Sequence, residues 1–340
     1  MKIFVTGHRG YIGTVLTRML FEQNFDVVGC DIGYYPQGFV VNKTPSLISL
    51  KKDIRDLTKN DLKDCNAVLH LAALSNDPLG EINPSLTHDI NFLATVRIAK
   101  IAKAAGIERF VFSSSCSSYG ATNGYVDETS KLAPLTAYAK SKVESERALL
   151  KLKDDKFFPV ILRNSTVYGI SPSQRLDLVV NNLVGSAVAT GKIQLLSDGS
   201  AWRPLLHVED IANAFIKTLE SSQQEINGEC FNVGSNEDNY TVREIAEKIG
   251  EVIPGSEIEF TKGARKDNRS YRVNFNKIKE TLGFQTVWKL KKGISHIYNT
   301  LKNKEFSEAD FKDKSFYRVA YLRWLINNRI LDSNLKFKKN

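Results

Sequence analysis

The 340-residue chain has few cysteines and no long apolar run. Its four cysteines, Cys30, Cys65, Cys116 and Cys230, form no CxxC pair and have no metal-like spacing. Neither a disulfide framework nor a metal site is therefore predicted, and the cysteines fit a reducing compartment. No apolar stretch approaches the roughly 18 residues of a membrane-spanning helix. The stretch MKIFVTG is too short for a secretory signal, so we expect a cytoplasmic protein without integral membrane contact.

The composition is that of a globular protein, with 42% hydrophobic and 25% charged residues. The net charge is +9, and residues 261–340 carry 20 Lys and Arg against 7 Asp and Glu. Such a region attracts nucleic acids, anionic membranes or phosphorylated small molecules. No zinc finger, RNP-like motif or recognition-helix pattern accompanies it, so we expect no nucleic-acid partner.

The first half of the sequence alternates short apolar runs with helix-like segments. The runs KIFVTG, DVVGCD, AVLHLAA, RFVFSSS and FPVILRN are typical of buried parallel strands, with helical segments such as 12–24, 91–106 and 138–152 between them. This alternation predicts an α/β fold with a doubly wound parallel sheet. Beyond residue 170 the pattern is irregular, which indicates a smaller, discontinuous lobe. We expect a large domain at 1–170 with 193–235 returning to it, a second lobe at 171–192 and 236–304, and a helical extension at 305–340.

A glycine-rich segment follows the first predicted strand and opens a helix. Gly7, Gly10 and Gly13 permit a tight turn and the close approach of a pyrophosphate, whose charge is favoured at a helix N-terminus. Asp31 ends the second predicted strand, at about the separation expected for a carboxylate that binds the adenosine ribose. A carboxylate there would repel a 2′-phosphate. The sequence therefore predicts NAD rather than NADP as the cofactor.

The GxxGxxG spacing resembles that of the extended short-chain dehydrogenase/reductases, and the similarity extends to about residue 300. The resemblance implies a Rossmann domain for NAD and a smaller α/β lobe that binds a nucleotide-diphosphate sugar. It places Asp53 and Ile54 beside the adenine and Asn91 at the opening of a helix. The expected cofactor-binding residues are Gly7, Arg9, Gly10, Tyr11, Ile12, Gly13, Asp31, Asp53, Ile54, Leu71, Ala72, Ala73, Asn91, Ser113, Tyr138 and Lys142.

Tyr138 and Lys142 carry the strongest chemical signal. They are four residues apart, so on a helix they share one face. The lysine ammonium and the positive nicotinamide ring are expected to lower the pKa of the tyrosine toward neutrality. The phenolate can then take a proton from a sugar hydroxyl as hydride passes to NAD. Ser115, at the end of a preceding strand, is expected to hydrogen-bond the same oxygen, which gives the catalytic set Ser115, Tyr138 and Lys142.

Two positions narrow the reaction. In the 4,6-dehydratases of this family an acidic pair follows the catalytic Ser or Thr, whereas here Cys116 and Ser117 follow Ser115. Dehydration is therefore not expected. The 3,5-epimerase/reductases use a cysteine two residues before the following Tyr, whereas Cys116 lies three before Tyr119. We therefore interpret Cys116 as a packing residue.

The resemblance also implies a diphosphate-binding set in the second lobe. Arg203 and Arg269 resemble the arginines that contact the diphosphate, and Asp267 resembles a ribose-binding aspartate. The stretch 171–182 resembles a subset with a GDP-heptose 4-dehydrogenase and proteins labelled as 4-epimerases, and Thr166 stands where an Asn is usual. The expected substrate-binding residues are Ser75, Ser115, Ser117, Thr166, Arg175, Asn182, Arg203, Asp267 and Arg269.

These patterns favour a nucleotide-sugar 4-epimerase that works through a transient 4-keto sugar. A 4-dehydrogenase that releases the keto sugar uses the same residues and remains the alternative, and an inactive NAD-binding regulator is a third. The resemblance implies a homodimer built from helices such as 91–106 and 138–152. For residues 305–340 we expect a helix docked on the body of the protein, with peripheral membrane contact as the other interpretation.

Overall fold

A computed structural model describes all residues except 37, 39–46, 266, 268, 339 and 340. Its centre is a seven-stranded sheet in the order β11-β7-β5-β4-β1-β2-β3, and every strand pairs in parallel with its neighbours. This sheet confirms the predicted doubly wound α/β fold. Its strands are β1 (Lys2–Thr6), β2 (Asp26–Asp31), β3 (Ile48–Lys51), β4 (Ala67–His70), β5 (Arg109–Ser115), β7 (Phe158–Asn164) and β11 (Cys230–Val233).

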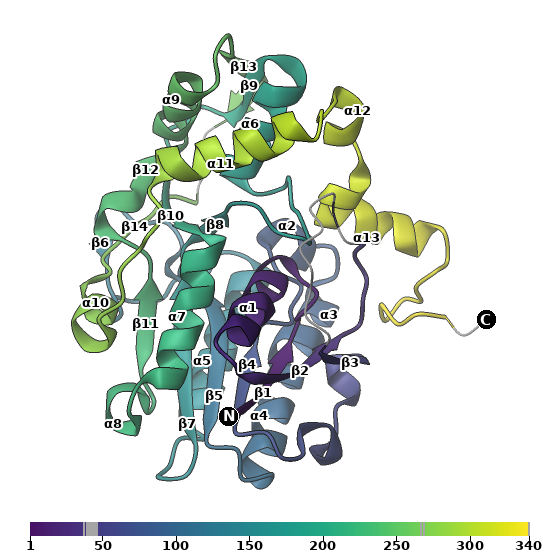
Figure 1. Cartoon of the computed structure of the whole chain (residues 1–340), viewed down its shortest axis with the longest axis vertical. Helices are drawn as coiled ribbons and strands as arrows, with labels where there is room; N and C mark the ends of the chain where they lie inside the picture. The colour runs from purple at the N-terminus through teal and green to yellow at the C-terminus, as the bar shows by residue number, and fades with distance from the viewer. Residues whose placement is uncertain (37, 39–46, 266, 268, 339–340) are drawn as a thin grey trace.

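Helices cover both faces of this sheet (Figure 1), because its central strands are apolar on both sides. Ile3 and Val5 face one core, which they share with α1 (Tyr11–Glu22) and α7 (Val208–Glu220). Phe4 faces the second core, with α4 (Ala94–Ala104) and α5 (Ala137–Leu150). Alternate side chains of one strand thus point to opposite layers, as the pleat of a strand requires.

The smaller lobe forms around a third apolar core. It contains α6 (Val179–Thr190), α9 (Val242–Val252) and α11 (Leu290–Asn303), the pair β9 (Lys192–Ser197) and β13 (Glu257–Arg265), and part of the sheet β12-β10-β8. That sheet comprises β8 (Thr166–Tyr168), β10 (Trp202–His207) and β12 (Asn239–Thr241). The remaining elements are β6 (Tyr125–Val126), β14 (Arg272–Val273), α2 (Asp77–Gly80), α3 (Pro84–His88), α8 (Gln223–Ile226), α10 (Asn276–Leu282), α12 (Glu308–Phe311) and α13 (Arg318–Asn327).

Residues 193–235, which we expect to return to the large domain, contribute elements to both lobes. The strand β11 joins the large sheet and α7 and α8 pack on that layer, whereas β9 pairs with β13 and β10 lies between β8 and β12. The local cause is Gly191, which ends α6 with a positive φ of 72°. The strand β9 follows at once, so the chain turns back along α6 and stays in the smaller lobe.

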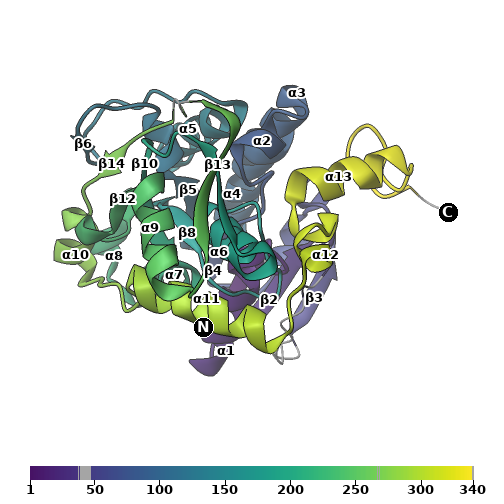
Figure 2. The ribbon, with the colours of Figure 1, turned by 90° about the horizontal axis from the view of Figure 1, so that it is seen from above.

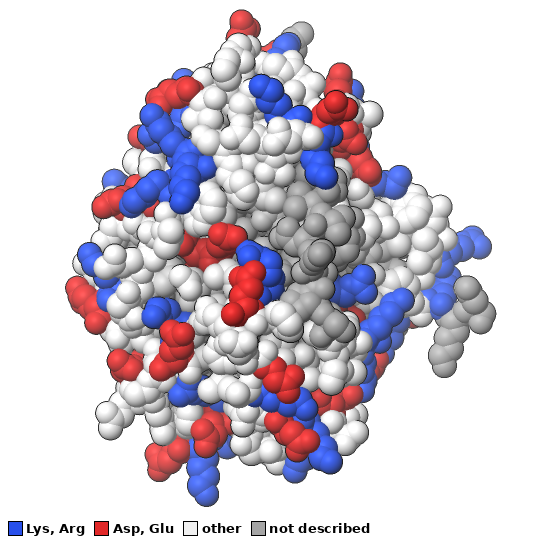
Figure 3. Space-filling model, in the orientation of Figure 1, with Lys and Arg blue, Asp and Glu red and all other residues white. Residues whose placement is uncertain are grey.

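The C-terminal segment packs against the large layer beside β2 and β3 (Figure 2). Leu322 and Leu325 of α13 are buried in the second core together with Leu331 and Leu335. The Tyr34 hydroxyl donates a hydrogen bond to the carbonyl of Leu335. No helix among the described residues is both long and apolar enough to cross a membrane. On the face shown in Figure 3, basic side chains are interspersed with acidic ones instead of forming one patch.

Candidate active site

A cavity of about 850 Å³ lies between the two lobes, at the carboxyl ends of the parallel strands. Ligands of open α/β sheets bind at this end, and the volume suits a small-molecule site. All nine residues predicted to bind substrate line it, and so do all the predicted cofactor residues except Arg9 and Asn91. The described residues contain no cluster of His, Cys, Asp and Glu that could hold a metal ion.

The glycine segment forms a close turn between β1 and α1. Gly7 has a φ of +75°, and a Cβ there would lie 2.8 Å from the amide nitrogen of Ala72. A Cβ on Gly13 would overlap the carbonyl oxygen of Gly7. Gly10 occupies the N-cap of α1 without a side-chain cap, so the first N–H groups of the helix remain available to an anion. The backbone here fits a cofactor pyrophosphate.

Asp31 ends β2 at the cavity wall. Its carboxylate accepts hydrogen bonds from the amides of Arg9 (3.2 Å) and Gly33 (2.7 Å), which fix its orientation. The side chain of Arg9 is exposed and lies outside the cavity lining, so only its backbone contributes. Asp53 lines the cavity near Ile54, and its carboxylate is held by Arg55 at 2.7 Å.

Asn91 does not line the cavity, contrary to its predicted cofactor contact. Its side-chain oxygen accepts from the amide of Leu74 (2.8 Å), and its Nδ2 donates to the Leu74 carbonyl (3.2 Å) and to the Ser141 Oγ (3.2 Å). Because these three bonds occupy the amide group, Asn91 braces the strand-end loop against α5. The contact with Ser141 ties that loop to the helix that carries Tyr138.

His70 and Thr6 hold the loop after β4. The Oγ1 of Thr6 accepts from the amides of Leu71 and Ala72, both at 3.2 Å, and lies 2.7 Å from His70 Nδ1. Burial lowers the pKa of His70 to about 3, with the charge of Lys142 adding to the shift, so the imidazole is neutral. The small residues after β4 are thereby fixed at the cavity wall.

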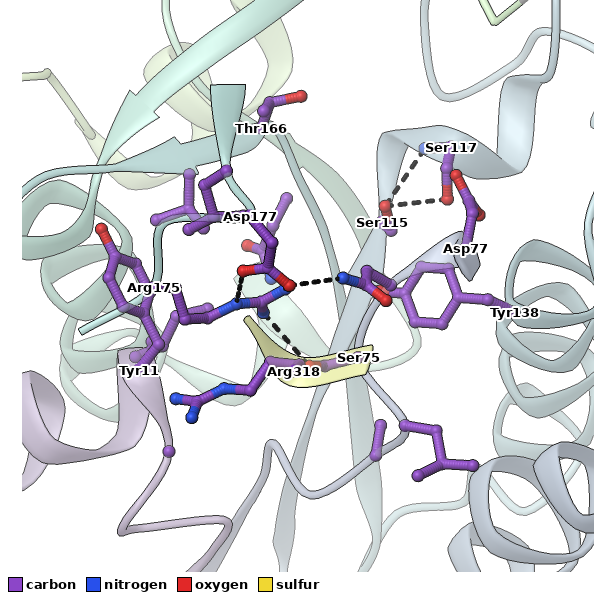
Figure 4. A pocket seen from close by; sticks show the side chains of 18 of the residues that line it. Tyr11, Ser75, Asp77, Ser115, Ser117, Tyr138, Thr166, Arg175, Asp177 and Arg318 are labelled. Atoms are coloured by element: carbon purple, nitrogen blue, oxygen red, sulfur yellow. Dashed lines mark hydrogen bonds and ion pairs between the residues drawn. The ribbon is translucent and has the colours of Figure 1, made fainter. Parts of the chain in front are cut away.

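Ser115, at the end of β5, and Tyr138, in the first turn of α5, line the same cavity (Figure 4). Lys142, one turn further along α5, lines it too. Lys142 is buried, and its Nζ donates to the carbonyl oxygen of Ser113 at 2.6 Å. That Nζ lies 5.6 Å from the ring centre of Tyr138. The Oγ of Ser115 accepts from Ser117, from its amide at 3.2 Å and its hydroxyl at 3.0 Å.

Burial controls the protonation of this group. It lowers the pKa of Lys142 to about 7, against a smaller upward effect of Glu146. Burial also raises the pKa of Tyr138, and Asp77 adds to the rise while Ser115 and Arg175 oppose it. The protein alone therefore does not lower the pKa of this tyrosine, which differs from the expected effect of Lys142.

Cys116 is fully buried outside the cavity lining. Its Sγ lies 3.1 Å from the carbonyl oxygen of Arg163, and burial raises the pKa of the thiol well above its usual range. Arg163 also forms a buried ion pair with Glu146 at 2.7 Å. These contacts agree with the packing interpretation of Cys116, because a protonated, enclosed thiol is a poor base.

The smaller lobe presents two arginines to the cavity around one carboxylate. Asp267 Oδ2 contacts Arg203 at 2.7 Å and Arg269 at 2.9 Å, and Arg269 also reaches Asp77 at 3.1 Å. Burial alone would raise the pKa of Asp267, but the hydrogen bonds from Arg269 and the charge of Arg203 hold it below its usual range. The two guanidinium groups are thus fixed at the cavity wall by Asp267 and Asp77, with their planar forks able to meet an anionic ligand.

Arg175 lines the cavity as one member of an ion pair with Asp177. The sequence motifs predicted Arg175 but not Asp177 as a site residue. Arg175 is buried, and its Nε contacts Asp177 at 2.8 Å while its Nη1 lies 3.2 Å from Ser75 Oγ (Figure 4). Asn76 donates to the same Asp177 at 3.0 Å. Asp177 stands two residues after Arg175 in the stretch 171–182, and this spacing of opposite charges is the sequence feature that could have indicated the pair. Other lining residues that the motifs did not indicate include Tyr34, Tyr35, Tyr317 and Arg318.

Residues 3–234 match the NAD dependent epimerase/dehydratase family. The chain belongs to this family. NAD is the family's cofactor, as the glycine segment and Asp31 predict. The match also confirms the resemblance to extended short-chain dehydrogenase/reductases.

Relatives of this family member catalyse more than one reaction. A putative UDP-glucose 4-epimerase of Methanocaldococcus jannaschii is 30% identical over 311 residues, which cover 88% of this chain and 98% of the relative. UDP-glucuronic acid decarboxylase 1 of Arabidopsis thaliana is 24% identical, covering 92% and 72% of the two chains. The structure of MoeE5 in complex with UDP-glucose and NAD is 26% identical, with a TM-score of 0.78 and coverage of 90% and 100%.

Proposed function

We propose that this protein is an NAD-dependent 4-epimerase of a nucleotide-diphosphate sugar. The observation that carries the proposal is the convergence of Ser115, Tyr138 and Lys142 in the cavity that also holds the glycine turn. A cavity of about 850 Å³ that is lined by Arg203 and Arg269 suits a ligand that joins a sugar to a diphosphate. The relative from Methanocaldococcus jannaschii supports the same reaction class.

Tyr138 acts as the base in this proposal. Bound NAD would accept the hydride from C4 and, once reduced, would give it back, which restores the cofactor. Its oxidised nicotinamide ring would also place a positive charge in the site. That charge, together with protonated Lys142, offsets the effect of burial on the pKa of Tyr138. The Tyr138 oxygen takes the proton of the C4 hydroxyl and later returns it. Ser115 donates a hydrogen bond to the same sugar oxygen, once its bonds with Ser117 adjust.

Two arginines hold the diphosphate of the substrate while the keto sugar rotates within the cavity. Arg203 and Arg269 bind the diphosphate, and Asp267 orients them. With the nucleotide held in this way, the sugar can present either face of its C4 carbonyl to the cofactor. Return of the hydride to the opposite face of C4 would give the epimer and restore the cofactor, so the reaction would consume no external oxidant.

A 4-dehydrogenase that releases the keto sugar is the second candidate. It is favoured by the stretch around Arg175 and Asp177, which resembles that of a GDP-heptose 4-dehydrogenase. Dehydration is disfavoured because Cys116 is enclosed and Ser117 carries no charge. An inactive regulator is the weakest candidate, because the base, the lysine and the serine are all present.

The test is incubation of the purified chain with UDP-, GDP-, CDP- and dTDP-sugars, followed by mass spectrometry and NADH absorbance. An isomer of unchanged mass without lasting NADH supports the epimerase and names the nucleotide. A product lighter by two hydrogens, with accumulating NADH, supports the dehydrogenase instead. The Tyr138→Phe variant should keep NAD affinity and lose turnover by at least about a hundredfold. Undiminished turnover in this variant would contradict the proposed base.

A further inference from the structure

The C-terminal segment reaches into the cofactor cavity. Tyr317 and Arg318, at the start of α13, line the same cavity as the glycine turn and Asp31. Figure 4 shows the Arg318 side chain extending from the C-terminal ribbon on the side of the cavity where Tyr11 and Arg175 lie. The helical extension is thus part of the site wall as well as a packing element.

Arg318 is buried and incompletely partnered. Only 3% of its surface is exposed, and its Nη2 donates to Ser173, to the carbonyl at 2.9 Å and to the Oγ at 2.7 Å. Its guanidinium carbon lies 4.0 Å from the ring centre of Tyr35. Neither Arg318 Nη1 nor the buried Tyr35 hydroxyl has a hydrogen-bond partner among the described residues. Buried donors without partners are uncommon, and these two residues line the cavity, where a ligand can supply the missing acceptor.

A short series of hydrogen bonds links Arg318 to the pyrophosphate end of α1. Ser173 donates through its amide to the Oγ of Ser171 at 3.2 Å. That hydroxyl donates to the carbonyl of Tyr11 at 2.7 Å and lies 3.0 Å from Thr14 Oγ1. Arg318 is therefore connected through Ser173 and Ser171 to the first turn of α1, whose free N–H groups suit an anion.

The charges around Arg318 leave room for an anion. Asp177, whose charge acts on Arg318, is engaged by Arg175 at 2.8 Å, and Arg318 forms no ion pair with any of the described residues. Burial, with the neighbouring charge of Arg175, lowers the pKa of Arg318 to about 10. The group is still charged at neutral pH. A buried charge is costly unless it is paired, and the Nη1 group of Arg318 has neither a carboxylate nor another acceptor among the described residues.

We propose that Arg318 binds the pyrophosphate of NAD, so that the C-terminal segment completes the cofactor site. The Nη1 group donates to a phosphate oxygen, while Nη2 stays on Ser173 and the ring of Tyr35 supports the guanidinium plane. The pyrophosphate thus lies between the N-terminus of α1 and the start of α13. This assignment depends on NAD binding by the family and is independent of which sugar reaction the enzyme catalyses.

The test is calorimetric titration of the full-length chain, freed of nucleotide, with ADP-ribose, adenosine and UDP. Arg318→Gln should weaken ADP-ribose binding by about tenfold to a hundredfold, the range for a hydrogen bond to a charged group. Adenosine, which lacks phosphate, should bind as it does to the parent, and so should UDP. Arg318→Lys should recover part of the loss, because it keeps the charge without the planar fork. The matched control is Arg323→Gln, an exposed position on the same helix.

Three results would overturn the proposal. Equal weakening of ADP-ribose and adenosine would make Arg318 a packing residue, and weakening of UDP alone would assign it to the substrate diphosphate. Unchanged ADP-ribose affinity would exclude any contact. Thermal melting checks that each variant folds. If Arg318→Gln does not fold, Arg318→Lys takes its place in the test. Because lysine lacks the planar guanidinium group, this variant should still bind ADP-ribose more weakly than the parent, with unchanged affinity for adenosine and UDP.

Discussion

At the scale of single residues, burial sets the charges on which the proposed chemistry depends. Lys142 is enclosed beside Ser113, and Tyr138 is enclosed beside Asp77, so both would be neutral more readily than in water. Perturbed groups of this kind cluster at functional sites because catalysis needs them. We expect the buried ammonium group of Lys142 to lower the free energy of unfolding.

Lys142→Met should separate stability from activity. Burial lowers the lysine pKa from 10.5 to about 7 in the folded chain. The unfolded chain therefore binds more protons between these pH values, and the folded parent gains stability as the pH rises through them. The variant should be more stable than the parent by about 2 kcal/mol at pH 7, after the loss of the bond to Ser113. This difference should narrow toward pH 10.

Urea unfolding at both pH values measures this difference, and turnover should fall sharply in the same variant. Lys140→Met, at an exposed position of the same helix, is the control and should leave both properties near the parent values. A stability gain independent of pH would mean that the lysine is not titrating in this range.

At the scale of elements, the turn between β1 and α1 fixes the cofactor end of the site. Its geometry depends on the absence of side chains, because Gly7 packs against Ala72 and Gly13 packs against the Gly7 carbonyl. The neighbouring helix α5 is held differently, by the polar contacts of Asn91 with Ser141. The position of the turn therefore depends on close backbone approach, and the position of α5 depends on the buried side-chain amide of Asn91.

Gly13→Ala should disrupt the cofactor turn. The added Cβ would overlap the carbonyl oxygen of Gly7, and a backbone atom cannot move aside without opening the turn. NAD affinity should fall by at least about tenfold, and the melting temperature should fall as well. Equilibrium dialysis with NAD measures the first effect. Gly124→Ala, where a Cβ meets nothing within 4 Å, is the control, and an equal loss in both variants would contradict this role.

At the scale of the whole molecule, three apolar cores join two lobes and a C-terminal segment around one cavity. The second core is shared by the large sheet and α13, through Leu322 and Leu325. We expect the C-terminal segment to unfold together with the large layer for this reason. The homodimer implied by the family resemblance, through α4 and α5, stays a prediction.

Leu322→Ala should destabilise the whole chain. The side chain is fully buried, so its truncation costs about 2–5 kcal/mol in lost burial and cavity formation. Urea unfolding followed by fluorescence should show one transition at lower denaturant. Leu196→Ala, where 74% of the residue is exposed, should change the unfolding free energy by less than about 1 kcal/mol. A separate early transition would show that the segment is not coupled to the large layer.

Local patterns of the sequence determined the parallel sheet, the glycine turn with Asp31, and the helix that carries Tyr138 and Lys142. Their constraints act over a few residues: φ and close approach at Gly7, helical spacing in α5, and apolar runs in the strands. Only the tertiary structure decided that Asn91 faces Leu74 and Ser141 and that β9 pairs with β13. It alone brought Arg318 to Tyr35, because partners more than 250 residues apart are chosen by burial and charge across the folded chain.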